Sequence, residues 1–544
     1  MRYLKYYLIV LGISTLPLIS IFLTSQFPHL HDGLVHLARI GAYFKALQDG
    51  QLPVRWAGDL NYGYGMPLFN FIYHVPYLIS SFFILLGAGL VNAFKITLVL
   101  SFLLSGIFMF GFSMAFFKNI KKAFLVTLFY QFIPFRLVEI LIRGSFGEVY
   151  AYAFFPLVLW GITLLFGKPS FKNILVVSLG TSLLILSHNS ISLVFFLICI
   201  FFVLFFAKRP KNYIYSFISL FLGLLLASFY WIPAIFEHRY TYGDLFMKNL
   251  YVSHFPPLLN FFIPNFLNDT RLQTGGISVQ FGLFHTFVFM LVLVVLFSKN
   301  KIAKLEKLII IFCLSIFLIA LFIMQPISIF VWEKIALLRQ FQFSWRLLSV
   351  VGFATSLMSI FLFYFKFFRK NIIYFPFLFL LVFSTVYYWR PVLGWDKVNE
   401  DYYWNFPLST TYFGETDVIW SEGPKNSYPK RRVDLIGGKG EIGEVIKKSN
   451  LRLFKVKAET EIQLVDNTQY FPGWRVLVDG RTVPIEFQDQ NWRGLITFRV
   501  PKGEHDIKVV FGESPVRFIA DTITIGTFGL LMVFGMLRKK IKLV

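Results

Sequence analysis

Thirteen long apolar runs constrain this chain more than any other feature. Most approach the roughly 20 residues that an α-helix needs to cross the hydrocarbon core of a bilayer. The runs lie near residues 6–24, 72–90, 96–117, 123–142, 149–167, 173–187, 190–207, 213–235, 279–298, 308–325, 346–365, 372–389 and 516–537. Of the 544 residues, 56% are hydrophobic and 15% are charged, against about 25% charged in an ordinary globular chain. The sequence therefore predicts a polytopic α-helical membrane protein and argues against a soluble enzyme.

Lysine and arginine residues predict how these helices are oriented, because they concentrate in the cytoplasmic loops of membrane proteins. If run 72–90 does not cross, both termini and every second connection share one side. That side holds 21 Lys and Arg residues and a single acid, Glu306. Its basic segments are Arg2 with Lys5, 118–122, 168–172, 208–211, 299–307, 366–371 and the tail 538–542. We therefore expect about twelve spanning helices, with 72–90 on or re-entering the outer leaflet and both termini cytoplasmic. The net charge of +23 is then an orientation signal, and nucleic acid has no support as a partner.

Composition also divides the chain into three parts. Residues 1–389 are predicted to form the transmembrane domain, with an outer first loop at 25–95 and a first span that is not cleaved. In residues 390–515 the acidic and basic residues nearly balance and the long apolar runs stop. The second half of this segment alternates apolar and polar residues and contains the hairpin dipeptide Asp479-Gly480. It predicts an extracytoplasmic β-sandwich, followed in 516–544 by the last transmembrane helix and a basic cytoplasmic tail.

Asp32 is the sharpest candidate for a functional residue. It lies just after the first apolar run, and His36 and Arg39 follow it at i+4 and i+7 on one helix face. Two roles remain open for its carboxylate. It could cap the helix by accepting backbone N–H bonds, or it could take part in chemistry, since ionisable residues at a membrane edge mark functional sites. The two roles are compatible because a capping residue is also held rigidly.

Further polar and aromatic residues fall on the same predicted outer side and make up a candidate substrate site. Its members are His31, His36, Arg39, Arg55, Trp56, Arg143, Glu148, His188, Arg239 and Arg346. Several of them also have a structural interpretation. Arg55-Trp56 and the Gly-rich segment after it are as typical of a membrane-surface anchor as of a sugar contact. For His188, a capping or packing role is the stronger interpretation.

Arg143, Glu148 and Arg346 have two interpretations each. The turn Arg143-Gly144-Ser145-Phe146-Gly147-Glu148 could bind a phosphate or a metal, or it could be an ion pair that neutralises itself. Arg346 could reach lipid head groups, or its guanidinium could pair with the phosphate of a lipid substrate.

Motifs of other chemistries are missing from the sequence. It contains no Walker loop, no GxGxxG before a helix, no HExxH and no GxSxG pattern. The histidines His29, His31 and His36 with Asp32 could ligate a divalent metal, but the i, i+2 spacing of the first two is poor on a helix. No cofactor is therefore firmly implied, and the predicted site has no metal ligand.

The residues carry a resemblance to known membrane proteins. A first span that is not cleaved, an acid in the first outer loop and many further spans resemble the GT-C superfamily of glycosyltransferases, which use polyprenyl-phosphate sugars. The segments HDGLVHLARI, LPVRW, GYGMPLFNF, RGSFGE, LSHN and FSWR resemble bacterial membrane proteins labelled "6-pyruvoyl-tetrahydropterin synthase-related". The segment YFPGWRVLVDGR and the later VPKGEHDIKVVF resemble the outer β-domain of YfhO-type bacterial membrane proteins. The resemblance covers nearly the whole chain and implies a GT-C-like protein of the bacterial cytoplasmic membrane.

The resemblance also implies a mechanism. In GT-C enzymes the first-loop acid is the general base that activates the acceptor hydroxyl, and Asp32 matches that position. Basic residues would stabilise the departing lipid phosphate, with Arg346, Arg143 and Arg239 as candidates. This sequence departs from the superfamily pattern in two places. Many relatives have paired acids in the first loop, whereas histidines flank Asp32, and Glu148 matches the second-loop acid only loosely.

Three functions follow from these observations. The first is transfer of a sugar from a polyprenyl-phosphate donor to an extracytoplasmic glycan, lipid or protein. The second is transport or flipping of a lipid-linked sugar, and the third is a non-catalytic envelope scaffold with a glycan-binding β-domain. Internal repeats and midplane charges, which are typical of transporters, are scarce here, so we favour the transferase.

Overall fold

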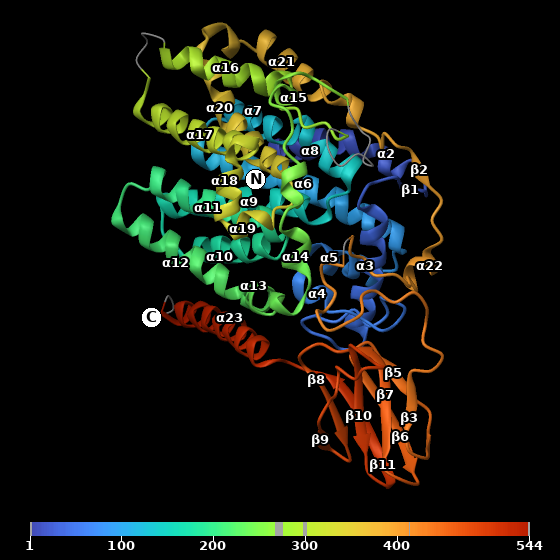
Figure 1. The fold of residues 1–544 in the computed structure, drawn as a ribbon. Coiled ribbons are helices and arrows are strands. Elements are labelled where there is room, and N and C mark those ends of the chain that lie inside the picture. Colours follow the sequence, from blue (N-terminus) through green and yellow to red (C-terminus); the bar gives the residue numbers. More distant parts are fainter. Residues whose placement is uncertain (1–2, 267–275, 298–301, 413, 542–544) are drawn as a thin grey trace.

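The computed structural model describes residues 3–266, 276–297, 302–412 and 414–541. Figure 1 shows a large helical body and, beyond one end of it, a body of β-strands. Every one of the thirteen apolar runs that the sequence contains forms helix. The predicted fold class, a polytopic helical membrane protein with a C-terminal β-region and a final apolar helix, is therefore confirmed.

Seven helical segments in the described part of the chain are long and apolar enough to cross a bilayer. They are Leu4–Phe22 (α1, Leu4–Thr15, and α2, Ile19–Phe22), α6 (Leu90–Phe117), α9 (Phe146–Gly167), α11 (Asn189–Phe206), α17 (Lys304–Ile323), Ser344–Tyr364 (including α20, Leu348–Met358) and Pro515–Leu537 of α23 (Pro515–Ile541). Two further runs are bent, one by 51° and one by 68°. They are α7 (Ile120–Gln131) with Pro134–Arg143, which begins as α8 (Pro134–Val138), and α12 (Pro210–Leu226) with α13 (Ser228–Phe236).

Four of the apolar runs form shorter helices. They are α5 (Val75–Leu85), α10 (Phe171–Ile185), α16 (Leu283–Phe297) and α21 (Asn371–Phe383). The 11 residues of α5 rise about 17 Å, well short of the roughly 30 Å hydrocarbon core, which fits the expectation that run 72–90 does not cross. The other three have 13 to 15 residues and are also short for a full crossing. The number of spanning helices, twelve by sequence, therefore stays a prediction.

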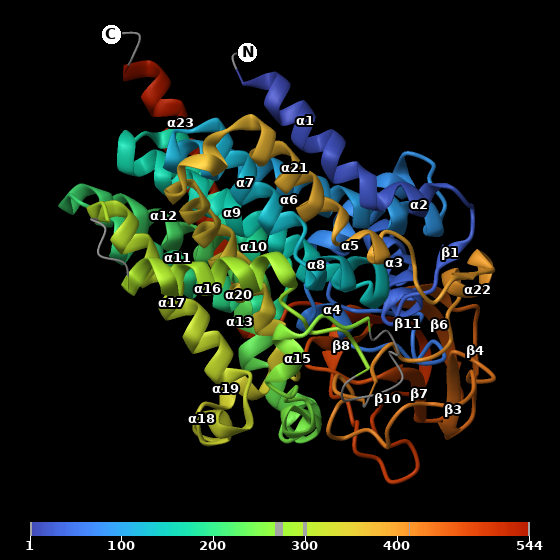
Figure 2. The same cartoon turned by 90° about the horizontal axis from the view of Figure 1, so that it is seen from above.

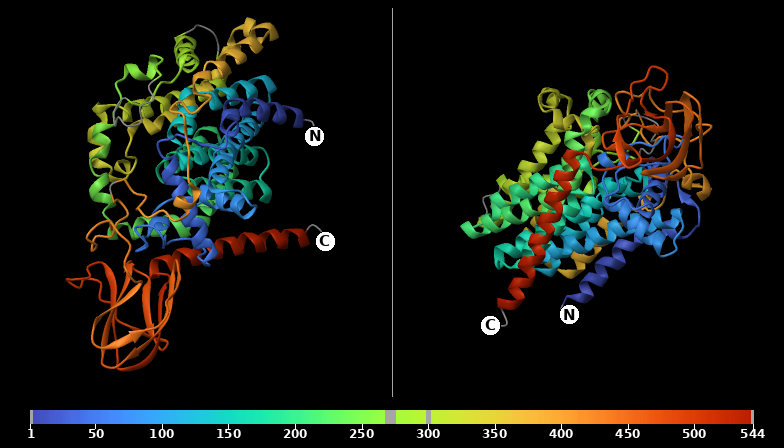
Figure 3. Two further views of the ribbon diagram at one scale, coloured as in Figure 1. Left: turned by 90° about the vertical axis from the view of Figure 1, so that its right-hand side faces the viewer. Right: turned by 90° about the horizontal axis from the view of Figure 1, so that it is seen from below.

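The two ends of the helical body differ in what they carry. Figures 2 and 3 show both chain termini at one end, with the β-strands toward the other. At the end that holds both termini, Lys122 Nζ lies 3.8 Å from Glu306 Oε1. There Lys121 Nζ also donates to the Arg369 carbonyl at 2.8 Å. Gly535 of α23 lies against Phe171. Segments that the sequence assigned to one basic side thus meet at the end where the chain begins and ends, although Arg2, Lys299, Lys301 and Lys542 lie outside the described residues.

The C-terminal strands form two antiparallel sheets. One has the order β10-β7-β3, and the other has the order β4-β6-β11-β8-β9 with β5 also paired to β6. The strands are β3 (Val433–Gly437), β4 (Gly440–Ile442), β5 (Ile446–Lys448), β6 (Leu451–Ala458), β7 (Ile462–Gln469), β8 (Trp474–Val478), β9 (Arg481–Val483), β10 (Leu495–Val500) and β11 (Gly503–Phe511). Side chains from both sheets fill one apolar core, which makes the pair a sandwich. Asp479 and Gly480 both have positive φ angles, +49° and +79°, and form the predicted tight hairpin between β8 and β9.

The first loop docks against this sandwich. Besides α5, its helices are α3 (Gly33–Gln48) and α4 (Leu68–Phe71). The buried Trp56 ring contacts Trp474 and Phe511, with centroids 5.4 and 5.3 Å away. Asp59 pairs with Lys45 and with Lys447 of β5 at 3.0 and 3.1 Å. Trp56 and Asp59 therefore hold the first loop against the β-sandwich.

Residues 390–432, which precede the sandwich, pass along the first loop. Two short strands, β1 (Phe27–Pro28) and β2 (Trp395–Asp396), pair antiparallel, and α22 (Glu400–Trp404) packs on α3. The carboxylate of Glu400 accepts the backbone N–H groups of Leu90 and Val91 at the start of α6. Because this segment is so closely joined to residues 1–389, a domain boundary at 390 stays a prediction. Four short helices complete the connections: α14 (Gly243–Met247), α15 (Leu259–Phe262), α18 (Ile329–Lys334) and α19 (Ala336–Arg339).

Candidate active site

Backbone hydrogen bonds between two turns that lie far apart in the sequence fix the position of Asp32. The N–H groups of His31 and Asp32 donate to the carbonyls of Ile142 and Arg143 at 3.0 and 2.8 Å. Gly144 follows with a φ of +67°, a conformation that glycine adopts without steric cost, and it turns the chain into α9. The HDG and RGS segments of the sequence therefore form one rigid junction.

The Asp32 carboxylate faces a mixed set of donors. Asp32 occupies the cap position of α3, but its side chain makes no capping hydrogen bond. The interpretation that its carboxylate caps the helix is therefore wrong. Instead His31 Nδ1 lies 3.2 Å from Oδ1, the Tyr412 hydroxyl donates to Oδ1 at 3.1 Å, and Arg143 Nη2 lies 3.7 Å from Oδ2. The Asp32 side chain keeps 20% of its surface exposed.

These neighbours determine the charge of Asp32. Burial alone raises the pKa of this carboxyl, but the hydrogen bond from His31 and the positive charge of Arg143 outweigh it and hold the pKa well below the ordinary value. Asp32 is therefore an ionised carboxylate throughout the neutral pH range, and it remains partly open to solvent.

Behind Asp32 lies a buried network of opposite charges. Arg143 Nη1 lies 2.7 Å from Glu139 Oε1 and 3.1 Å from Glu148 Oε1. Arg346 Nε lies 2.9 Å from the same Glu148 oxygen, and Arg346 Nη1 donates to the Phe341 carbonyl at 2.8 Å. The Glu139 and Glu148 side chains are fully buried. Of the two interpretations of the Arg143–Glu148 turn, the structure contains the ion pair.

We call Asp32, Glu139, Glu148, Arg143 and Arg346 the Asp32 cluster. It has three carboxylates and two guanidinium groups, and Glu148 Oε2 is buried without a hydrogen-bond partner. The guanidinium of Arg143 lies over the Trp345 ring at 4.7 Å, and that of Arg346 lies over Phe343 at 4.8 Å. Taking several charges out of water is costly unless each is paired. In the part of the chain that the structure describes, no three His, Cys, Asp or Glu side chains gather as metal ligands.

The predicted histidines lie around this cluster. His188 Nε2 is 3.8 Å from Glu148 Oε1, and its Nδ1 accepts the N–H of Ile191 at the start of α11 at 3.4 Å, so the capping interpretation of His188 is confirmed. His36 Nδ1 lies 2.9 Å from the Tyr77 hydroxyl. Burial, aided by the charge of Arg39, lowers the pKa of His36 to about 3, so this ring is neutral at pH 7.

A segment after α22 covers the exposed side of the site. Arg39 Nε donates to Thr410 Oγ1 at 3.0 Å. Two residues later, Tyr412 reaches Asp32, and the ring of His31 stacks on the Tyr412 ring with centroids 5.9 Å apart. Asp32 and Arg39, which the sequence placed on one helix face, are thus both contacted by this segment.

Three predicted site residues are not part of this arrangement. Arg55 Nη2 lies 2.6 Å from Asp521 Oδ1 in α23, and Arg55 Nε lies 3.3 Å from Glu513. Trp56 is buried against the β-sandwich. Arg239 is exposed and donates to the Tyr240 hydroxyl at 2.9 Å. The contacts of Arg55 and Trp56 explain their positions as structural ones.

The second charged network, which we call the Arg55 cluster, joins the first loop, α13 and α23. Arg517 Nε lies 3.3 Å from Glu237 Oε1 and 3.8 Å from Glu513 Oε2. The amide of Asn70 donates to Glu237 Oε2 at 2.8 Å. The members of the Arg55 cluster are Arg55, Arg517, Glu237, Glu513 and Asp521.

Two residues of the site were not predicted from the sequence, namely Glu139 of the Asp32 cluster and Tyr412, which contacts Asp32. Glu139 precedes Arg143 by four residues, a spacing that brings side chains together on a helix, so a search for i, i+4 pairs would have found it. Tyr412 lies 380 residues from Asp32 in a segment without regular structure, and no sequence signal connects them.

Comparison with known proteins identifies the family of this chain. The model of the "6-pyruvoyl-tetrahydropterin synthase related domain; membrane protein" family matches residues 69–392. This chain belongs to that family. One relative of this family member, an "Uncharacterized protein" from Lactococcus lactis subsp. cremoris (strain MG1363), is 28% identical to it over 191 residues. The match covers 34% of this chain and 31% of the relative, so it spans only about a third of that protein.

Solved structures with some similarity to this family member include two glycosyltransferases. Arabinofuranosyltransferase AftD from Mycobacteria has a TM-score of 0.43 and 16% identity, over 70% of this chain and 27% of that one. The oligosaccharyltransferase of Archaeoglobus fulgidus in its apo form has a TM-score of 0.44 and 13% identity, over 74% of this chain and 56% of that one.

Proposed function

We propose that this protein is a membrane glycosyltransferase that uses a polyprenyl-phosphate sugar as donor and Asp32 as general base. The acceptor is an extracytoplasmic glycan, lipid or protein of the cell envelope. The observation that carries the proposal is the Asp32 carboxylate itself, which is ionised, partly exposed and held by His31, Tyr412 and Arg143. It lies at the start of α3, away from the basic end of the helical body where both termini lie. By the positive-inside rule that basic end faces the cytoplasm, so Asp32 faces outward, where envelope acceptors are found.

The reaction follows from this placement. Asp32 accepts the proton of an acceptor hydroxyl, and the hydroxyl oxygen forms a bond to the anomeric carbon of the donor sugar. The bond from that carbon to the phosphate oxygen breaks, and the polyprenyl phosphate leaves with the electron pair. Configuration at the anomeric carbon inverts because attack and departure occur on opposite faces. A positioned base contributes roughly 100- to 10,000-fold to such a reaction.

Arginine residues of the site supply the electrostatic part of catalysis, which is stabilisation of the leaving phosphate. Arg143 fixes the Asp32 carboxylate, and both Arg143 and Arg346 already pair with Glu148. Arg39 follows Asp32 at i+7 on one helix face and donates to Thr410, and we take it as a further candidate cation for the leaving phosphate. A guanidinium suits this role because its planar N–H groups match phosphate oxygens.

A transfer assay on the full chain tests the proposal. The protein is reconstituted in proteoliposomes with polyprenyl-phosphate sugars labelled in the sugar and with an envelope extract as acceptor. We expect a labelled glycosidic product and released polyprenyl phosphate, both reduced at least about 100-fold in Asp32→Asn. Asp59→Asn is the matched control, because Asp59 is also a first-loop carboxylate but pairs with Lys45 and Lys447.

The contrary outcomes are specific. If folded Asp32→Asn transfers sugar as fast as the unaltered protein, Asp32 is not the base. If labelled lipid crosses the bilayer without any glycosidic product, the protein is a transporter.

A further inference from the structure

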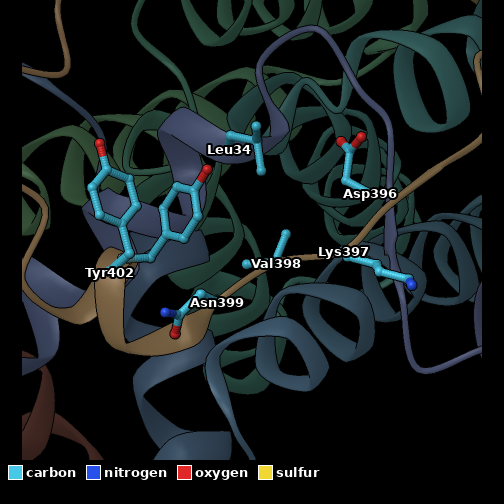
Figure 4. A pocket seen from close by; sticks show the side chains of 7 residues that line it. Leu34, Asp396, Lys397, Val398, Asn399 and Tyr402 are labelled. Atoms are coloured by element: carbon cyan, nitrogen blue, oxygen red, sulfur yellow. The ribbon is translucent and has the colours of Figure 1, made fainter.

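The first turn of α3 meets the later part of the chain on two different faces. Leu34 lies two residues after Asp32, and residues at that spacing do not face each other on a helix. Figure 4 shows Leu34 beside an open pocket whose other lining residues, 396–399, 402 and 403, belong to β2, the turn after it and α22. The open space therefore lies away from the Asp32 carboxylate, which meets the hydroxyl of Tyr412 instead.

The four residues 409–412, in the segment that covers Asp32, all carry hydroxyl groups. The hydroxyl of Thr410 accepts from Arg39 Nε at 3.0 Å, and the hydroxyls of the residues on either side of it lie 3.2 Å apart. The fourth hydroxyl, that of Tyr412, donates to Asp32 Oδ1 at 3.1 Å. Of the hydroxyl groups in the described part of the chain, it is the only one that is hydrogen-bonded to Asp32.

The chain on both sides of Tyr412 is fixed by backbone hydrogen bonds. Before it, the Leu408 carbonyl accepts the N–H of Asn61 in the first loop at 3.3 Å. After it, the Asp417 carbonyl accepts the N–H of Tyr242 at 3.0 Å. The segment between these two points is short, so Tyr412 is held close to the start of α3.

The Tyr412 hydroxyl has the geometry of an acceptor. A general base must lie within about 2.6–3.2 Å of the oxygen whose proton it takes, and the 3.1 Å between Tyr412 and Asp32 Oδ1 meets this condition. The His31 ring stacks on the Tyr412 ring, and His31 Nδ1 lies 3.2 Å from the same carboxylate oxygen, so phenol and base are kept together. Tyr412 is nonetheless 57% exposed, which leaves the residue accessible to a second substrate.

The phenol needs a base before it can react. Burial, aided by the negative charge of Asp32, raises the pKa of Tyr412 above its ordinary value of about 10, so the hydroxyl keeps its proton at neutral pH. Asp32 is ionised under the same conditions and can accept that proton while the phenol oxygen forms its new bond.

We propose that Tyr412 is itself a glycosylation site, modified by the active site of its own chain. The proposal rests on the proposed function, because Asp32 is the base in both reactions. The phenol oxygen of Tyr412 forms a bond to the anomeric carbon of the donor sugar, and its proton passes to Asp32. The bond from that carbon to the phosphate oxygen breaks, and the polyprenyl phosphate leaves with the electron pair. The product is a sugar joined to the chain through the oxygen of Tyr412.

Labelling of the chain itself tests this modification. The full chain is placed singly in nanodiscs with polyprenyl-phosphate sugars labelled in the sugar, without an added acceptor, and peptide mass spectrometry locates the label. We expect a labelled sugar on Tyr412, no label in Tyr412→Phe, and labelling at least about 100-fold slower in Asp32→Asn. Tyr428→Phe is the matched control and should be labelled like the unaltered chain. Tyr428 is 56% exposed, but its hydroxyl donates to the Asn405 carbonyl instead of a carboxylate.

The site of the label in the unaltered chain decides the proposal even if a variant folds poorly. Transfer to an envelope acceptor with no label on Tyr412 overturns the modification and leaves the transferase standing. No label on either the chain or an acceptor overturns both. Undiminished labelling of Tyr412→Phe places the sugar elsewhere and overturns the modification. Label that mild alkali releases from Asp32 is a glycosyl ester, which makes Asp32 a nucleophile and overturns its role as base in both reactions.

Discussion

Two charged clusters in this protein have the same composition but different surroundings. The Asp32 cluster and the Arg55 cluster each contain three carboxylates and two guanidinium groups. Exposure alone does not distinguish them, because Glu513 of the Arg55 cluster is 37% exposed and Asp32 is 20% exposed. The difference lies in the partners of the most open carboxylates.

In the Arg55 cluster the carboxylates pair with arginines across separate parts of the chain. Arg55 Nη2 lies 2.6 Å from Asp521, and Glu513 lies between Arg55 and Arg517. In the Asp32 cluster the nearest arginine nitrogen is 3.7 Å from Asp32, and a histidine and a tyrosine hydroxyl are the close donors. A substrate hydroxyl can replace a tyrosine hydroxyl far more easily than it can replace a guanidinium. On our proposal, the Arg55 cluster stabilises the fold and the Asp32 cluster serves the chemistry.

Arg143→Met should have the largest effect on stability. It leaves Glu139 and Glu148 without their shared partner in a buried site, and breaking a buried pair costs about 3–5 kcal/mol. The free energy of unfolding in mixed micelles measures the loss. The double variant Arg143→Met/Glu139→Gln removes both charges of one pair and should recover part of it. An unchanged free energy in the single variant would show that this network does not stabilise the helical body.

Arg55→Met should cost less, about 1.5–3 kcal/mol, because its partners Glu513 and Asp521 are partly exposed and can regain water. The effect should appear as faster proteolysis between the β-sandwich and α23, with sugar transfer per folded molecule unchanged. Arg239→Met is the control, since Arg239 is exposed and should change stability by under about 0.5 kcal/mol. Loss of transfer in folded Arg55→Met would break the distinction between the two clusters.

His31→Ala should change how transfer depends on pH. The hydrogen bond from His31 helps to lower the pKa of Asp32, so the unaltered carboxylate stays charged as pH falls below its ordinary pKa of about 3.9. Without His31 the pKa rises, because burial then has less to oppose it, and transfer should decline at a higher pH than in the unaltered protein. Initial rates from about pH 8 down to the lowest pH at which both proteins stay folded measure this shift. Identical acid limbs in the two proteins would mean that His31 does not tune Asp32.

Tyr412→Phe should have the smallest effect, and it should strengthen acceptor binding. The variant keeps the ring that stacks on His31 but removes the donor to Asp32 Oδ1. If the acceptor hydroxyl takes the position of the Tyr412 hydroxyl, the acceptor KM should fall by up to about tenfold with kcat nearly constant, since a typical hydrogen bond has a net worth of about 0.5–1.5 kcal/mol. A lower kcat at unchanged KM would instead give Tyr412 a part in the chemical step.

The sequence predicted the elements better than it predicted their contacts. Apolar runs and period-2 alternation are local properties, so the helices and the hairpin at Asp479-Gly480 could be recognised directly. Arg55 and Trp56 were assigned to the substrate site because nothing local distinguishes a docking residue from a binding residue. Their true partners, Asp521 and Trp474, exist only once the β-sandwich and α23 have returned to the first loop. The approach of Tyr412 to Asp32 depends on the same long-range return.

The most direct test compares Asp32→Asn with Asp521→Asn in one transfer assay, alongside their melting temperatures. Both variants replace one carboxylate by its amide, each in a cluster of three acids and two arginines. We predict that Asp32→Asn loses at least about 100-fold in transfer with little change in melting temperature, and that Asp521→Asn melts earlier but transfers normally per folded molecule. Full transfer by Asp32→Asn, or an equal loss in both variants, would contradict the assignment of Asp32 as the base.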